Sequence, residues 1–197
     1  MTIHSYIAFQ QQAAGGTWLD SESQLDFSKN TEPLMNTPVK LTNGKIFEVE
    51  DFSFDIEQTL NIGSASAGAG AGKVTFNPFS ITRKVDKVSP LLFQMACSAA
   101  PFETVVLALA SSAGVATAGG AAGQIFVRFD FKLVAVKTIS WGYDADSPNE
   151  RVTFEYGGLQ VRYSQQNPNG TFAQPSVGGW NRVKNVQDLT SAPLSPA

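Results

Sequence analysis

The stretch Gly72–Ser98, GKVTFNPFSITRKVDKVSPLLFQMACS, decides how the chain folds. Its first half alternates apolar and polar residues, which is typical of a β-strand with one buried face. A basic turn follows, after which Ser89 and Pro90 suit the N-cap and the first position of a helix. Apolar residues then recur at helical spacing, and Pro101 ends the helix. We therefore predict a strand, a turn and one short helix around which the remaining strands pack.

Three strand-like segments elsewhere change the face on which their apolar residues lie. The changes fall at Glu50-Asp51, at Asn77-Pro78 and at Gly157-Gly158. Since alternation reverses only where a residue is inserted or a strand is broken, each change indicates a β-bulge or a sharp bend. Strands bent in this way can serve two sheets. We therefore predict a mainly β fold, a tight β-barrel or two-sheet sandwich with one short side helix.

The remaining segments set the domain organisation. Ile3–Phe9 predicts a first strand, and Ile125–Leu133 alternates most cleanly between apolar and charged residues. Gln10–Asn43 keeps no regular period, so we predict a long inserted loop at about 10–44, with one short element at Trp18–Phe27. We expect a single domain over residues 1–185 and a flexible tail over 186–197.

Residues Gly170–Lys184 are rich in turn formers and contain Trp180, a candidate for burial. The single cysteine, Cys97, excludes an internal disulfide, and its apolar neighbours predict that it is buried.

Composition argues against several classes of protein. Of the 197 residues, 43% are hydrophobic and 16% are charged, and the net charge of -3 gives no sign of a basic nucleic-acid-binding face. The start, MTIHSYIAFQQQ, lacks the basic region of a signal peptide, and no window is apolar enough to span a bilayer. We expect a soluble protein without membrane insertion that, if exported, uses no cleaved N-terminal signal.

A glycine-rich run, GAGAGK at Gly68–Lys73, invites comparison with a phosphate-binding loop. The pattern requires a glycine where Ala67 stands and a serine or threonine where Val74 stands. The segment that follows alternates like a strand, whereas phosphate binding uses a helix N-terminus. A flexible loop is the better interpretation.

Other catalytic chemistry finds equally little support. A nucleophilic Cys97 would need His4, the only histidine, as its base, and GSASAG at Gly63–Gly68 lacks the spacing of a serine nucleophile elbow. Asp144 and Glu155 fit calcium-loop positions, but other positions of that loop do not match. The carboxylates between Glu48 and Glu57 suit solvated strand positions. We predict no catalytic, cofactor-binding or metal-binding residues.

Several motifs in order resemble one known family. The central stretch contributes Gly72-Lys73, Arg83, Asp86-Lys87, Ser89-Pro90 and Cys97. Further along, SWGYDADSPNERVTFEYGGLQVRYSQQNPNGT contributes Glu150, Phe154, Val161 and Tyr163, and GGWNRVKN gives a Gly-Trp…Asn ending. The chain is similar in these motifs to the haemolysin-coregulated proteins (Hcp), tube subunits of bacterial type VI secretion systems. The resemblance covers about 3–9 and 45–185, and the 10–43 segment is longer than most members carry.

The resemblance implies a tight β-barrel, six copies of which form a ring. Rings would stack into a hollow tube that carries a trimeric spike at its tip, is driven by a contracting sheath and holds effector cargo in its lumen. It also implies a bacterial cytoplasmic protein that is exported to the extracellular space or into a target cell.

Two sets of residues acquire roles through the resemblance. Ser53, in Phe52-Ser53-Phe54, matches a strand that faces the lumen. The glycine-rich loop that matches the ring-stacking loop supplies the candidates Gly63, Ser64, Gly68, Gly70 and Gly72. The alternative from a different class is a β-sandwich binding module for a carbohydrate or other ligand, in which exposed Trp18, Trp141 and Trp180 would stack on the ligand. A hydrolase using His4 is the weakest hypothesis.

Overall fold

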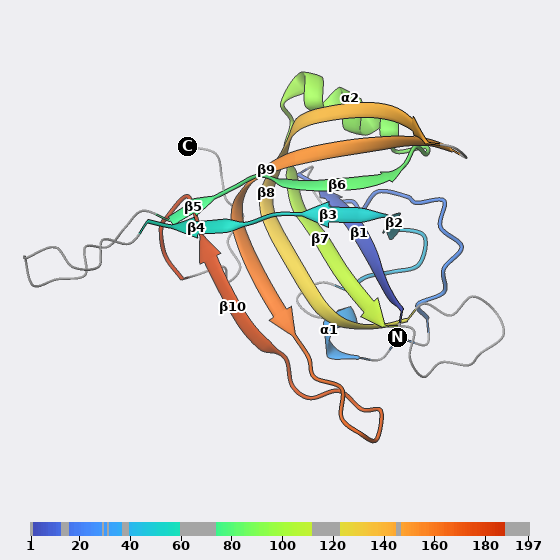
Figure 1. Cartoon of the computed structure of the whole chain (residues 1–197), viewed down its shortest axis with the longest axis vertical. Helices are drawn as coiled ribbons and strands as arrows, with labels where there is room; N and C mark the ends of the chain where they lie inside the picture. The colour runs from blue at the N-terminus through green and yellow to red at the C-terminus, as the bar shows by residue number, and fades with distance from the viewer. Residues whose placement is uncertain are drawn as a thin grey trace, which may run out of the picture.

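The computed structural model describes residues 2–12, 16–28, 30, 32–36, 40–59, 74–111, 123–144 and 147–187 (Figure 1). The chain is mainly β, as predicted. In chain order the elements are β1 (Ile3–Gln11), α1 (Pro33–Asn36), β2 (Phe47–Val49), β3 (Asp51–Ser53), β4 (Ile56–Gln58), β5 (Val74–Phe76), β6 (Phe79–Lys84), α2 (Ser89–Ser98), β7 (Phe102–Ser111), β8 (Gln124–Asp144), β9 (Ser147–Tyr163) and β10 (Ser176–Asn181).

One antiparallel sheet curls into a nearly closed barrel. Its strand order is β2-β1-β7-β8-β9-β6-β3, with β10 added to β9. The two outer strands, β2 and β3, are consecutive in the chain, and only Glu50 separates them. The backbone N–H of Glu50 donates to the carbonyl of Thr82 on β6 at 2.9 Å. The sheet therefore closes through its own chain, which confirms the predicted barrel and leaves little free edge.

Two of the predicted face changes are breaks where a strand changes partners. At Glu50 the chain leaves β1, the partner of β2, and joins β6, the partner of β3. At Asn77-Pro78 it leaves the small β4–β5 ribbon and enters the barrel as β6, which pairs with β3 and β9. Proline lacks the N–H that a ladder position needs, so a change of partner at this point is favoured.

The third face change occurs without an inserted residue. Tyr156 and Leu159 both belong to the main core, yet β9 and β8 keep register across the break, with Lys132 opposite Gly158 and Val134 opposite Tyr156. Leu133, between those two β8 residues, has φ 50°. Both strands therefore switch faces together, and the bulge predicted within β9 at this point is a paired distortion of two strands.

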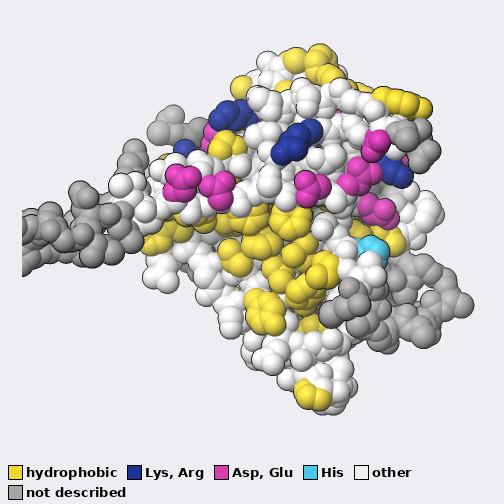
Figure 2. All heavy atoms as spheres, viewed as in Figure 1, with side chains coloured by type: hydrophobic (Ala, Val, Ile, Leu, Met, Phe, Trp, Pro, Cys, Tyr) yellow, Lys and Arg dark blue, Asp and Glu magenta, His cyan; other side chains and the backbone are white. Residues whose placement is uncertain are grey.

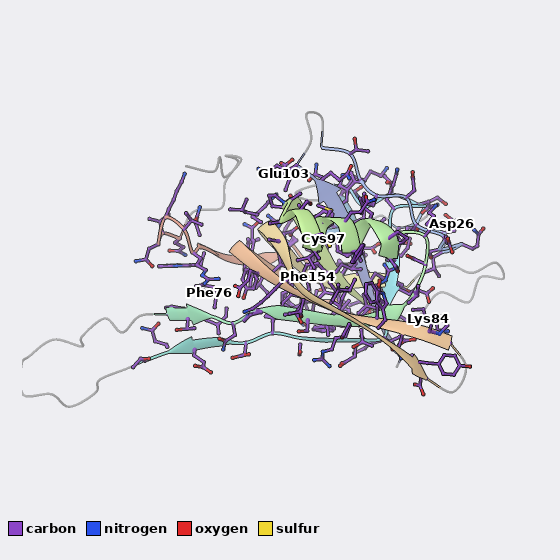
Figure 3. The ribbon with its side chains drawn as sticks, turned by 90° about the horizontal axis from the view of Figure 1, so that it is seen from above. Asp26, Phe76, Lys84, Cys97, Glu103 and Phe154 are labelled. Carbon is purple, nitrogen blue, oxygen red and sulfur yellow. The ribbon has the colours of Figure 1, made fainter. Side chains whose placement is uncertain are left out.

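The main core is built around stacked aromatic rings. Phe79 lies parallel to Phe131 with centroids 4.2 Å apart and to Phe154 with centroids 4.8 Å apart. Leu92 and Met95 of α2 are buried in the same cluster, so the helix covers the barrel on one side, away from β3 and β6 (Figure 3). Figure 3 also places Phe154 beneath this helix. Aromatic burial of this extent dominates the stability of the barrel.

The start of α2 differs by one residue from the prediction. Val88 occupies the N-cap position without a side-chain capping bond, and Ser89 is the first helical residue. The Ser89 side chain points instead to Glu150 on β9, to which its hydroxyl donates at 2.9 Å. The helix ends at Ser98, and Ala99 takes the left-handed conformation with φ 54°. Pro101 follows and cannot continue the helix.

A second apolar core lies on the opposite face of the β1–β7–β8 sheet. Residues of the 16–46 segment, among them Phe27, Leu34 and Leu41, pack there against Tyr6 and Val106. The short element of this segment is α1, whereas the predicted position, 18–27, contains only isolated bridges such as Gln10–Trp18. The segment predicted as a long inserted loop is thus, in its described parts, a covering layer.

The prediction that residues 170–184 are turn-rich was wrong for the part that forms a strand. Ser176–Asn181 forms β10, which pairs along β9 from Tyr163 to Gly158. The half-buried Trp180 of this strand packs against the main core.

Candidate functional site

The structure does not assemble the catalytic pairs that the sequence allowed. His4 is exposed on β1 and lies against Tyr6, with ring centroids 6.4 Å apart. Cys97 is exposed on α2, so the prediction of burial was wrong; it occupies the helix face turned away from Leu92 and Met95. Within the described chain no hydrogen bond joins the two, and no group of three His, Cys, Asp or Glu side chains could hold a metal ion.

The three tryptophans lie on separate surfaces. Trp18 packs against the second core, Trp180 packs against the main core, and Trp141 contacts Phe93 with ring centroids 5.9 Å apart. A stacking platform needs its rings on one face. The binding-module hypothesis therefore loses the feature that motivated it.

The motif residues of the central stretch meet in one buried ion cluster. Arg83, at the end of β6, forms ion pairs with Asp86 in the following turn and with Glu150 on β9, where the Nε–Oε1 distance is 3.1 Å. Its guanidinium lies 5.0 Å from the centre of the Phe47 ring, which adds a cation–π contact. Arg83 and Glu150 are both fully buried.

Glu150 ties three elements together. Its carboxylate accepts hydrogen bonds from Ser89 Oγ of α2 at 2.9 Å and from Trp141 Nε1 of β8 at 3.2 Å, besides Arg83 of β6. Burial raises the pKa of Glu150 above its ordinary value, and the neighbouring Arg83 opposes that shift. The signature residues therefore lock α2 onto the barrel. They show no arrangement for catalysis.

A row of hydroxyl groups crosses the barrel wall on the face opposite this cluster. In register, Ser53 on β3 is followed by Ser80 on β6, Thr153 on β9 and Thr138 on β8. The hydroxyl oxygens of Ser80 and Thr153 are 3.0 Å apart. Ser53 and Thr138 are exposed. Residues two positions along continue the face as Asp51, Thr82, Arg151 and Ser140, so the wall is polar and its side chains are exposed or half-buried.

The other predicted site residues, Gly63, Ser64, Gly68, Gly70 and Gly72, lie outside the described residues. They fall in the segment between β4 and β5. The β4–β5 ribbon itself extends away from the barrel, well beyond the wall formed by β3 and β6 (Figure 1).

A second buried ion cluster lies under the 16–46 segment. Arg128 and Asp130, both fully buried on β8, make a bidentate contact with Nη2–Oδ1 at 2.7 Å. Asp130 also faces Arg162 on β9 at 3.5 Å, and Arg128 Nη1 donates to the carbonyl of Leu34 in α1 at 3.0 Å. Nearby, burial lowers the pKa of Lys132, which donates to Thr104 Oγ1 at 2.7 Å.

Sequence reasoning missed this second cluster because the charges alternate with apolar residues, as solvated charges on a strand also do. The sequence feature that could have revealed the cluster is the opposite charge of its neighbouring residues. Arg128 and Asp130 stand two apart and so share one strand face.

A nearly closed antiparallel barrel, with one side helix held to it by a buried Arg–Glu pair, is the class of fold that this chain adopts. Residues 40–163 match the family described as "Type VI secretion system effector, Hcp". The chain belongs to this Hcp family, as the sequence motifs predicted. Comparison with curated proteins gives no match.

Solved structures share the fold. A type six secretion system protein superposes with a TM-score of 0.72 at 22% identity, covering 95% of this chain and 100% of the other. Hcp1 from Salmonella typhimurium gives 0.60 at 15% identity, covering 95% and 100%. A type VI secretion system effector from Yersinia pestis gives 0.60 at 13% identity, covering 90% and 98%. Of the helices in the described residues, none has the length and apolar character needed to cross a membrane.

Proposed function

We propose that this protein is the structural subunit of a type VI secretion inner tube. Six copies form a ring, and rings stack into a hollow tube for effector delivery. The observation that carries the proposal is the Hcp match over residues 40–163, which includes all strands of the barrel except β1 and β10. The protein has a structural role and no catalytic one.

The subunit's partners follow from the same assignment. Each copy contacts copies of itself within and between rings, the tube ends at a spike protein, and a contractile sheath surrounds it. Effector cargo travels in the lumen. The protein leaves the bacterial cytoplasm with this machine. Residues 1–185 act as one domain, and residues 188–197 of the predicted tail, 186–197, lie outside the described residues.

Electron microscopy of negatively stained, purified protein tests the proposal. We expect six-fold rings and, at high concentration, stacked tubes. A species that stays monomeric at every concentration, with no rings in the images, would overturn the assignment.

Ser53 and its hydroxyl row form the lumen wall in this proposal. A wall of small hydroxyl groups fits a channel that passes varied cargo, since it offers hydrogen bonds without large apolar side chains. A Ser53→Cys variant in a Cys97→Ser background, labelled with a maleimide gold cluster, should show density at the ring centre. The wild type labelled at Cys97, on the helix side of the barrel (Figure 3), is the matched control and should show density away from the centre. Gold outside the ring on the Ser53→Cys variant would remove Ser53 from the lumen.

The glycine-rich segment between β4 and β5 is assigned to ring stacking. Deletion of residues 64–71 should leave the subunit folded and the rings intact but reduce the proportion of stacked tubes in sedimentation. Tubes that persist in unchanged proportion would refute the stacking role of Gly63, Ser64, Gly68, Gly70 and Gly72.

A further inference from the structure

One apolar sheet surface continues out of the barrel and, among the described residues, is left partly exposed. On the core-facing side of the sheet, Leu109, Val127 and Tyr163 form one cross-strand row, and Phe129 and Val161 belong to the next. We call these five residues the open sheet face. Tyr163 is 49% exposed and Val161 is also exposed, although the Phe129 ring still contacts Phe54 at 5.1 Å. Contiguous apolar patches of this kind mark interaction sites.

A second exposed apolar surface lies at the other end of the molecule. It consists of residues at the end of β6, on α2 and at the end of the β8–β9 hairpin, which we call the aromatic tip: Val85, Phe93, Trp141, Tyr143 and Pro148. Tyr143 is 78% exposed and pairs with Pro148, whose carbonyl accepts from the N–H of Val85 at 3.1 Å. Figure 2 shows hydrophobic side chains in both places, along the top of the molecule and below β3 and β4.

Exposed lysines lie beside the aromatic tip, together with Asp144 next to Tyr143, whereas the exposed charges that follow Phe54 beside the open sheet face are acidic. Asp55 and Glu57, exposed on and before β4, follow directly after Phe54, and a row of Asp and Glu side chains borders the lower apolar area in Figure 2. Lys84 and Lys87, both exposed, flank Val85 of the aromatic tip. Within the described residues, none of these four charged groups is in a salt bridge. Opposite charges favour contact between unlike surfaces, whereas tip-to-tip contact would bring lysines together.

We infer that the open sheet face of one copy binds the aromatic tip of the next copy within the ring. The inference rests on the proposed function and specifies its lateral contact. Two different surfaces at opposite ends of one chain give a heterologous interface, and such interfaces generate closed rings when the rotation closes. Aromatic residues on the tip and an apolar sheet opposite them are the composition expected at an interface core.

Two double variants test this contact by sedimentation velocity over a concentration series. Phe93→Ser/Tyr143→Ser alters only the tip, and Val161→Ser/Tyr163→Ser alters only the open sheet face. Each should raise the subunit concentration needed for rings at least ~10-fold, while circular dichroism and the unfolding transition show a folded barrel. Val177→Ser is the matched control. Val177 is 55% exposed, but it pairs with Arg162 and so lies on the opposite face of the same β9–β10 ladder.

Mixing the two double variants separates unlike from like contacts. In the mixture, one variant keeps an intact sheet face and the other keeps an intact tip. These two surfaces can join once, so we expect a dimer of the two variants and no ring. Rings formed by either double variant alone at wild-type concentrations would overturn the inference and leave the tube assignment standing. Absence of rings in the wild type would overturn both.

The charges provide an independent check. Lys87→Glu should weaken ring formation, and adding Glu57→Lys should restore it, because the pair is then reversed across the interface. Equal weakening in the single and double variants would contradict contact between these two ends.

Discussion

Two buried arginines serve the two ends of the β8–β9 hairpin in different ways. Arg83 joins the inside of the barrel to α2 through Glu150, and its partners also bond to Ser89 and Trp141. Arg128 lies on the opposite face of the sheet, paired with Asp130, and reaches the carbonyl of Leu34 in the covering segment. The first cluster unites the motif residues Arg83, Asp86 and Ser89 with Glu150, and the second anchors the covering segment.

The difference shows what each cluster depends on. In the Arg83 cluster, Arg83 has two carboxylate partners, Asp86 and Glu150, and Glu150 also accepts hydrogen bonds from Ser89 and Trp141, so the loss of one partner leaves others in place. In the Arg128 cluster, Asp130 is the shared anion of two buried guanidinium groups. Removing one partner of a buried pair costs more than the pair itself contributes, because a desolvated charge remains. We therefore expect the second cluster to be the more sensitive one.

The largest effect should come from Asp130→Ala. It removes the carboxylate that both Arg128 and Arg162 contact, and we expect a loss of about 3–5 kcal/mol in the free energy of unfolding. Urea denaturation measures it. Glu155→Ala is the control, since Glu155 pairs with Lys137 and Arg182 at the surface and should cost no more than about 1 kcal/mol. Equal losses in the two variants would contradict the proposed role of burial.

Glu150→Gln should have a smaller effect that depends on pH. Arg83 keeps Asp86, and the glutamine carbonyl can still accept one hydrogen bond, so we expect a loss of about 2 kcal/mol near pH 4. Burial raises the pKa of Glu150, so the folded state binds this proton more tightly than the unfolded state does. The contribution of Glu150 to the free energy of unfolding is therefore complete below the unfolded-state pKa and declines as pH rises through the folded-state pKa. The cost of the substitution should therefore shrink between pH 4 and pH 7 in parallel denaturation curves. A cost that grows with pH would contradict this assignment.

Gly157→Ala tests the paired distortion of β8 and β9, which lies between the Arg83 cluster and the Arg128 cluster. A Cβ at this position would lie 3.2 Å from Leu133 Cβ and 3.2 Å from Val183 Cγ2, so we expect a loss of about 1–3 kcal/mol. Gly178→Ala, where an added Cβ meets nothing within 4 Å, is the matched control on the same ladder. Thermal unfolding should separate the two; indistinguishable melting temperatures would argue against crowding at Gly157.

Ser89→Ala should give the smallest effect. It removes the hydrogen bond to Glu150, where Arg83 and Trp141 remain, and the one that Ser89 Oγ accepts from the backbone N–H of Asp86, and a loss of about 1 kcal/mol is expected. Hydrogen exchange of the α2 amides should rise while barrel amides stay protected. Unchanged exchange in α2 would mean that Ser89 does not fasten the helix.

Much of the barrel could be predicted from local sequence. The breaks at Glu50 and Asn77-Pro78 are visible as changes of alternation, because a side chain's face is fixed by its position along the strand. The helix is visible through Ser89 and Pro90, although Ser89 gives up the N-cap role for a partner 61 residues away. That exchange depends on tertiary contact, which local pattern does not contain.

The local sequence pattern also failed to predict the structure of the covering segment and of β10, because tertiary contacts hold both in place. Phe27, Leu34 and Leu41 stand seven residues apart, but Pro33 and Pro38 interrupt the sequence between them, so the spacing does not indicate one continuous helix or strand. Gly178 and Gly179 are typical of a turn, so the sequence did not indicate β10. This strand is held by ladder pairing with β9 and not by the β-propensity of its side chains. Ser53 remains a prediction from the resemblance alone, and the hydroxyl row that it belongs to becomes visible only through cross-strand register.

The mass of the assembled particle tests the central claim most directly. Light scattering on the size-exclusion peak of purified wild-type protein should give six times the 21.1 kDa subunit mass, or a series of multiples of that ring. A peak at one subunit mass at every concentration would contradict the account of this barrel as a tube subunit.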